Sequence, residues 1–155
     1  MVGHDVSGRI RLYLLATLIL GLLGMGTELL LIGHFETIQQ RIPLVLLGLG
    51  IATTCWHAAA PKRTTVRALQ VVMTLCVVSG VVGVGLHYQG NEEFELEMYP
   101  AMRGIELVQK VLTGATPVLA PGSMALLGLI GLTHLYRHPA IHGGAGAPPN
   151  EEGDT

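Results

Sequence analysis

Apolar residues dominate four long stretches of this chain, and short polar segments separate them. The stretches cover residues 12–32, 42–60, 68–88 and 117–136. A helix that rises 1.5 Å per residue needs roughly 20 apolar residues to cross a hydrocarbon layer about 30 Å thick. The pattern therefore predicts an all-α membrane protein, with a four-helix transmembrane bundle in a single domain of residues 1–137.

The connection between the third and fourth stretches is the longest in the chain. Gly90 and Asn91 predict a turn at its start. Residues 94–98 then alternate between apolar and acidic, which fits either a short extended segment or a helical turn, and Pro100 ends either one. Residues 101–113 carry apolar side chains at helical spacing. They predict a short amphipathic helix that lies on the outer membrane surface or caps the bundle.

The last apolar stretch has an unusual beginning. Pro121 suits the first turn of a helix, so a continuous helix is expected from there to about Arg137, some 17 residues, which is short for a full crossing. Residues 117–120 then either form a re-entrant segment that lines a cavity or lie in the headgroup region. Beyond them, residues 138–155 are rich in Gly and Pro and predict a disordered cytoplasmic tail.

Composition supports the membrane assignment, since 50% of residues are hydrophobic and 13% are charged. The mean hydropathy of +0.52 is high for a soluble domain. The positive-inside rule predicts that both termini and the second connection are cytoplasmic. The expected location is the cell membrane, with the bacterial inner membrane favoured. The cationic residues behind this orientation are Arg9, Arg11, Lys62, Arg63, Arg67 and Arg137.

One carboxyl group, that of Glu28, falls inside a predicted span, where a charge costs about 2.5–3.5 kcal/mol. Glu28 shares a helix face with Gly21 and Gly24, and small residues mark faces where helices approach closely, so we expect it to point into the bundle. The third stretch repeats this spacing, with His87 at the equivalent position. Glu28 and His87 could therefore meet across a close helix contact.

This pair suggests a metal site on the outer side. The candidate ligands are Glu28, His34, His87 and Glu95. Imidazole and carboxylate groups together suit zinc, iron or manganese. The competing interpretation is structural, with Glu28 neutral or hydrogen-bonded to His87 and the outer glutamates simply solvated. Further acidic residues expected on the same side are Glu36, Glu92, Glu93 and Glu97.

The remaining histidines raise the question of a b-type haem, which two histidines on facing helices commonly ligate. The pairs His57 with His134 and His34 with His87 would each place a haem at the rim of the bundle. For His57, His134 and His138, the simpler interpretation is anchoring in the inner interfacial belt.

The sequence contains no recognisable catalytic motif, and no basic patch predicts nucleic-acid binding. We therefore expect a non-enzymatic accessory or structural component of a membrane complex, in contact with lipid and with a membrane protein partner or a second copy of itself. The alternative is a protein that binds or conducts divalent cations or protons through the outer Glu and His cluster. A haem carrier ranks third. No cofactor is expected, with a divalent metal (zinc, iron or manganese) as the possible exception.

Overall fold

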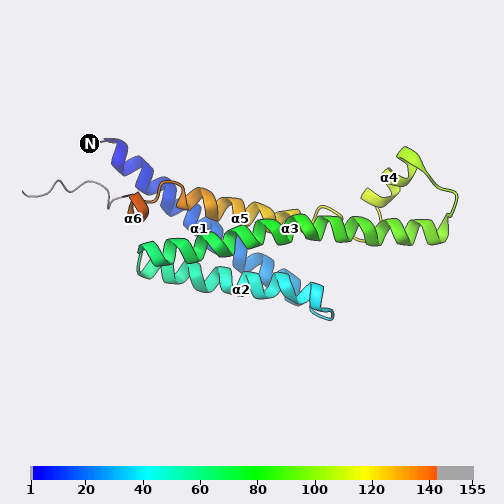
Figure 1. Ribbon diagram of the computed structural model, residues 1–155, viewed down its shortest axis with the longest axis horizontal. Helices are drawn as coiled ribbons and strands as arrows, with labels where there is room; N and C mark the ends of the chain where they lie inside the picture. Colours follow the sequence, from blue (N-terminus) through cyan, green and yellow to red (C-terminus); the bar gives the residue numbers. More distant parts are fainter. Residues whose placement is uncertain (1, 143–155) are drawn as a thin grey trace, which may run out of the picture.

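The computed structural model describes residues 2–142 and the side chains of residues 6–141. Within this range the chain is all-helical. Four helices form a bundle, and the distal half of one of them extends well beyond it with a short helix at its side (Figure 1). The helices are α1 (Val2–Leu31), α2 (Ile38–Ala59), α3 (Arg63–Met98), α4 (Gly104–Leu112), α5 (Gly122–Leu135) and α6 (Pro139–His142).

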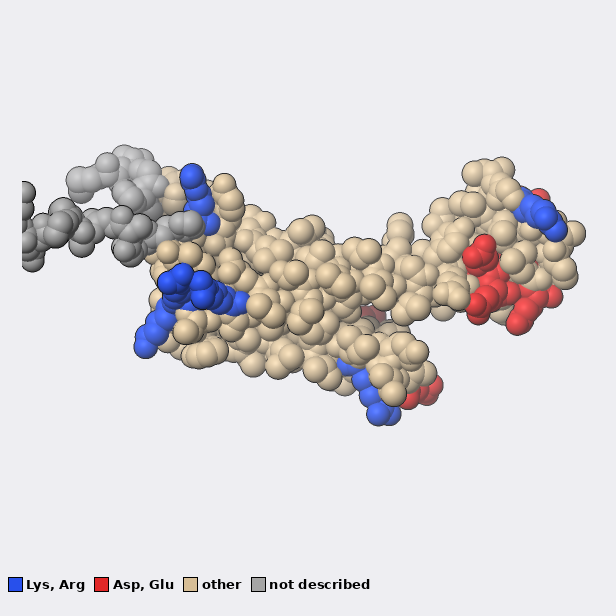
Figure 2. Space-filling view, viewed as in Figure 1, with Lys and Arg blue, Asp and Glu red and all other residues tan. Residues whose placement is uncertain are grey.

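Three of these helices are long and apolar enough to cross a membrane, namely α1 from Val6, α2 and α3. The fourth helix of the bundle, α5, is apolar but has only 14 residues. Charged side chains lie at the ends of the molecule, and a broad charge-poor band separates them on the visible face (Figure 2). The protein therefore carries several apolar helices that contact a lipid bilayer.

The prediction of a turn at Gly90 and Asn91 is wrong, because α3 continues through both residues to Met98. For residues 94–98 the helical alternative is the correct one. At 36 residues α3 is about 54 Å long, well above the roughly 30 Å of a hydrocarbon core. Asn91 tolerates a position inside the helix because its side chain is buried and fully hydrogen-bonded to another segment, as described below.

The predicted amphipathic helix exists as α4, which begins at Gly104 rather than at residue 101. Arg103 is extended and Gly104 has a φ of +65°, a left-handed conformation that glycine adopts without strain. The helix packs beside the distal end of α3 and not across the end of the bundle (Figure 1). The alternative in which it caps the bundle is therefore wrong.

The helix in the last apolar stretch, α5, begins close to its predicted position, with Pro121 as its N-cap. Before it, two bonds between backbone groups three residues apart join Ala120 to Pro117 and Gly122 to Leu119. Residues 118–121 thus form tight turns that continue the line of α5. α5 ends at Leu135 and is shorter than expected. The predicted tail starts with helix α6, and residues 143–155 lie outside the described residues.

The bundle is held together by a close contact between α3 and α5, the most extensive helix pair in the structure. A Cβ atom on Gly80 would lie 2.5 Å from the backbone nitrogen of Ala125, and one on Gly128 would lie 2.5 Å from the backbone oxygen of Met73. Glycines therefore let the two backbones touch. Around this contact the core is filled by Leu18, Leu22, Leu47, Leu69, Met73, Cys76 and Leu127.

The expectation that Glu28 points into the bundle is wrong, since its side chain is exposed. The buried face of α1 follows Leu18 and Leu22 and continues through the partly buried Met25. Glu28 lies to one side of that face. Gly24 also faces open space, so the glycines of α1 do not mark a continuous contact there.

We expect Gly80→Ala to destabilise the protein by about 1–3 kcal/mol, because the new methyl group would meet backbone atoms that cannot move aside. Gly85→Ala on the same helix is the matched control, since nothing lies within 4 Å of its added methyl group. Thermal unfolding of both variants in a mild detergent measures the difference. Equal stabilities would contradict the contact between α3 and α5.

Candidate functional sites at the two ends of the bundle

The predicted outer metal site is only partly assembled. His34, in the connection after α1, and His87 on α3 have ring centroids 6.3 Å apart. Glu95 is buried eight residues beyond His87, about 12 Å along the helix, and Glu28 is exposed on α1. Among the described residues, these four do not form a group whose ligating atoms all lie within 4.8 Å. The outer site stays a prediction.

Burial lowers the pKa of His34 below its ordinary value, and the nearby His87 lowers it further. His87 also has its Nδ1 atom 3.3 Å from the backbone oxygen of Pro117. This contact places the beginning of the last apolar stretch at the level of His87.

At the opposite end, three histidines come together. His57 in the last turn of α2, His134 in the last turn of α5 and His138 after α5 have potential ligating atoms within 4.8 Å of one another. The side chains of His57 and His134 are buried, and that of His138 is half-buried. We call these residues the histidine cluster. It lies at the basic end of the molecule, defined by Arg11 and Lys62.

The two buried histidines of the cluster face each other through their Nε2 atoms, which are 3.3 Å apart. The Nδ1 atom of His134 lies 3.0 Å from the backbone oxygen of Arg11. Because a carbonyl oxygen can only accept, Nδ1 of His134 carries the proton and donates it. In the neutral ring, Nε2 of His134 is then left with a free lone pair.

The Nδ1 atom of His57 lies 3.3 Å from the hydroxyl oxygen of Thr65. That hydroxyl accepts from the backbone N–H of Lys62 at 3.0 Å and is 2.9 Å from the backbone oxygens of both Ala60 and Lys62. When its one proton goes to a carbonyl, the hydroxyl accepts from Nδ1 of His57. In that arrangement Nε2 of His57 also presents a lone pair toward Nε2 of His134; in the other tautomer Nε2–H of His57 donates to His134.

His138 completes the cluster because the chain reverses after α5. Arg137 has a φ of +50°, the left-handed region that residues with a side chain seldom adopt. The ring of His138 lies 4.9 Å from that of His57, and its Nδ1 atom accepts a 3.2 Å bond from the backbone N–H of Ala140. Burial lowers the pKa of His138 to about 4, and the nearby charges of His57, Arg11 and His134 act in the same direction.

Arg11 closes the basic end by joining α1 to the end of α5. Its guanidinium group donates to the backbone oxygens of His134 at 2.6 Å, Tyr136 at 2.9 Å and Arg137 at 3.2 Å. The last carbonyl groups of a helix lack hydrogen-bond partners within the helix. A cation at this end also interacts favourably with the negative end of the helix dipole. Arg11 thus fixes the position of His134 twice, through its side chain and through its backbone oxygen.

The far end of α3, α4 and the connection up to Thr116 form a second unit, which we call the head. Asn91 joins its parts. The Nδ2 atom donates to the backbone oxygens of Val111 and Thr116, both at 2.8 Å. The Oδ1 atom accepts from the backbone N–H of Thr116 at 3.1 Å and from its hydroxyl at 2.7 Å. All the hydrogen-bonding capacity of this buried side chain is used inside the head.

The surface of the head combines exposed apolar side chains with acidic ones. Phe94 and Met98, one turn apart on α3, are 47% and 54% exposed, and Ile105 on α4 is 73% exposed. Glu93 and Glu97 follow the neighbouring face of α3. Acidic side chains gather over the head in Figure 2. Exposed apolar groups in an ordered unit outside the bundle are typical of an interaction surface.

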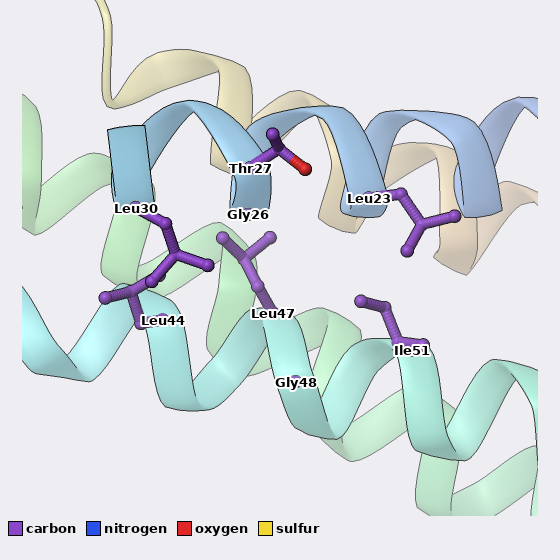
Figure 3. Close-up of a pocket in the computed structure, with 8 residues that line it drawn as sticks. All are labelled: Leu23, Gly26, Thr27, Leu30, Leu44, Leu47, Gly48 and Ile51. Carbon is purple, nitrogen blue, oxygen red and sulfur yellow. The ribbon is translucent and has the colours of Figure 1, made fainter. Parts of the chain in front are cut away.

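An apolar groove of about 220 Å³ separates α1 from α2 on one side of the bundle. Gly26 and Gly48 form part of its walls, and nothing lies within 4 Å of a Cβ atom on either. Around them stand leucine and isoleucine side chains, and the only polar side chain is that of Thr27 (Figure 3). Such a surface accepts hydrocarbon and offers no catalytic chemistry.

No protein-family model, curated protein or solved structure matches this chain. Similarity to known proteins therefore gives none of these residues a role. The sequence offered His57 and His134 as a possible haem pair and His138 as an interfacial anchor, but it did not group the three histidines as a metal site. The sequence feature that could have identified the cluster is position: His57 and His134 end two predicted spans, and His138 follows the span that His134 ends.

We expect Asn91→Ala to loosen the head, because the carbonyl groups of Val111 and Thr116 lose their donor at a cost of about 1–3 kcal/mol. Amide hydrogen exchange in α4 should then quicken by roughly 5- to 150-fold. Gln89→Ala is the control, since its bond to Glu93 is exposed and its removal should leave α4 unchanged. Unchanged exchange in the Asn91 variant would show that α4 is held by other contacts.

Proposed function

We propose that this protein is a four-pass, non-enzymatic component of a membrane complex that acts by binding a partner through its head. The observation that carries the proposal is the length of α3. About 54 Å of continuous helix exceeds the hydrocarbon core by some 24 Å, enough to carry the head out of that core. The hydrogen bonds of Asn91 then keep the head in one arrangement.

The contacts of α5 support a fourth crossing, although the helix alone is short. Pro117 contacts His87 at one end, and His134 contacts His57 beside Thr65 at the other. Residues 117–134 thus accompany α3 from residue 87 to residue 65, about 33 Å of helix. The turns at residues 118–121 supply the length that α5 lacks.

The charge distribution supports an orientation with the basic end in the cytoplasm. The head would then lie on the outer side, which is the periplasm if the membrane is a bacterial inner membrane. Reporter fusions test this directly. A reporter that functions only in the cytoplasm should be active when joined after Arg63 or after the C-terminus. A reporter that functions only outside the cytoplasm should be active when joined after Ala101. The opposite pattern would contradict the orientation and place the head in the cytoplasm.

The surface of the head indicates the kind of partner. Phe94, Met98 and Ile105 offer apolar contact area, and the acidic face at Glu93 and Glu97 beside them would favour a cationic rim on the partner. We therefore propose a protein partner with an apolar depression bordered by Lys or Arg. A second copy of this chain would be an alternative occupant.

Site-specific crosslinking tests this surface in native membranes. A photoreactive amino acid at Ile105 should yield one dominant adduct, while the same group at Lys110, an exposed polar position on another face of the same helix, should yield little. Phe94→Glu should weaken the Ile105 adduct at least tenfold, since it places a charge in the apolar contact. The mass of the adduct separates a partner from a second copy. The absence of any crosslinked adduct from Ile105 would contradict the proposal.

A further inference from the structure

We propose that His57, His134 and His138 bind one divalent transition metal of the zinc class at the basic end of the bundle. The site is separate from the head and from the outer residues that the sequence suggested. The buried pair His57 and His134 provides the strongest part of the argument, and His138 supplies the third ligand.

The distance between the two buried histidines matches tetrahedral coordination. Zinc binds imidazole nitrogen at about 2.0–2.1 Å, and two ligands at a tetrahedral angle are then about 3.3–3.4 Å apart. The Nε2 atoms of His57 and His134 are 3.3 Å apart. A metal ion could therefore bind between these nitrogens without moving either helix.

The hydrogen bonds of the cluster are compatible with a cation at the same place. Both Nε2 atoms present lone pairs when Nδ1 of His57 donates to Thr65 and Nδ1 of His134 donates to the backbone oxygen of Arg11. Two neutral acceptors cannot form a hydrogen bond with each other, and they repel at this distance. A metal ion accepts both lone pairs and converts the repulsion into two bonds.

The partners of the Nδ1 atoms are those that metal-bound histidines usually have. A ligating imidazole nearly always donates its second N–H to a carboxylate, a backbone carbonyl or water, which fixes the ring and strengthens it as a ligand. Here the carbonyl of Arg11 has this role for His134, and the hydroxyl of Thr65 lies where it can accept from His57. Both rings are therefore oriented for coordination by groups on other helices.

His138 is the adjustable member of the cluster. Its Nδ1 atom accepts the long 3.2 Å bond from Ala140, and binding a metal requires it to give up this bond. The left-handed backbone at Arg137 already turns the chain so that the rings of His138 and His57 pack edge to face. Three histidines leave the fourth tetrahedral position open to water or to a ligand from outside the cluster.

The chemistry of the donors limits which metals fit. Three imidazoles suit zinc, cobalt, nickel or copper, whereas magnesium and calcium need oxygen ligands. The cationic Arg11 stands close by, and its charge opposes a metal that binds through electrostatic attraction alone. A haem does not fit between His57 and His134, because two axial nitrogens on opposite faces of an iron would be about 4 Å apart.

Zinc binding to the full-length protein tests the proposal. The protein is purified in mild detergent with an affinity tag that contains no histidine, stripped with a chelator, and titrated with Zn²⁺. We expect one zinc per chain, with the stoichiometry falling to near zero in His57→Ala and His134→Ala. Cys55→Ala is the matched control, because this exposed thiol on the same turn of α2 as His57 is a potential zinc ligand outside the cluster.

Two further variants separate loss of a ligand from loss of the fold. His138→Gln changes a half-buried residue outside the bundle helices and should weaken zinc at least tenfold while thermal unfolding of the stripped protein stays unchanged. Thr65→Val should weaken zinc by roughly 10- to 100-fold, and Thr65→Ser should restore it, since the serine keeps the hydroxyl beside His57. Cobalt(II) bound in place of zinc should show a tetrahedral absorption spectrum that His138→Gln alters.

Several results would overturn the proposal. Wild-type protein that binds no zinc in the titration would exclude the site and leave a hydrogen bond between His57 and His134 as the explanation of their contact. Equal zinc content in the wild type and in His57→Ala, His134→Ala and His138→Gln would exclude the cluster. Zinc that is lost only in a Glu28→Ala, His87→Ala double variant would place the metal at the outer residues instead.

Discussion

The contact between α3 and α5 is the constraint on which the rest of the molecule depends. Glycine at position 80 of α3 and at position 128 of α5 brings the two backbones into direct contact, which is possible only where no side chain intervenes. This contact fixes the height of α5 along α3, and with it both of its ends. Pro117 comes to His87 at one end and His134 comes to His57 at the other. Both candidate sites therefore inherit their geometry from this packing.

The head shows how one polar residue can decide the length of a helix. By local preference Gly90 and Asn91 favour a turn. Beyond the bundle, burial of apolar side chains against the other long helices no longer stabilises α3 as a helix. The side chain of Asn91 changes this balance, since its four hydrogen bonds, one to Val111 in α4 and three to Thr116 after it, are possible only while α3 stays helical at that position. The continuation of α3 and the placement of α4 are thus one cooperative arrangement.

The sequence predicts those features that depend on local pattern. The apolar stretches, the start of the last helix at Pro121 and the short amphipathic helix all follow from spacing and from turn chemistry. Features that depend on contacts between distant segments do not follow. The exposure of Glu28 reflects which face of α1 meets its neighbours, and the histidine cluster requires segments 77 residues apart to pack in one register. Helical periodicity defines a face but not the partner of that face.

The two groups of histidines also differ in how they could hold a cation. At the outer end, the exposed Glu28 and the pair His34 and His87 would compete with water for an ion, and the carboxylates would have to be brought together at an entropic cost. At the basic end, the packing of α2 and α5 has already brought two nitrogens together, and their desolvation has already occurred on folding. A ligand set that is organised by the fold binds more tightly than one that must be organised by the ion. The neutral histidines at the basic end are therefore better organised to bind a metal than the acidic residues of the outer end.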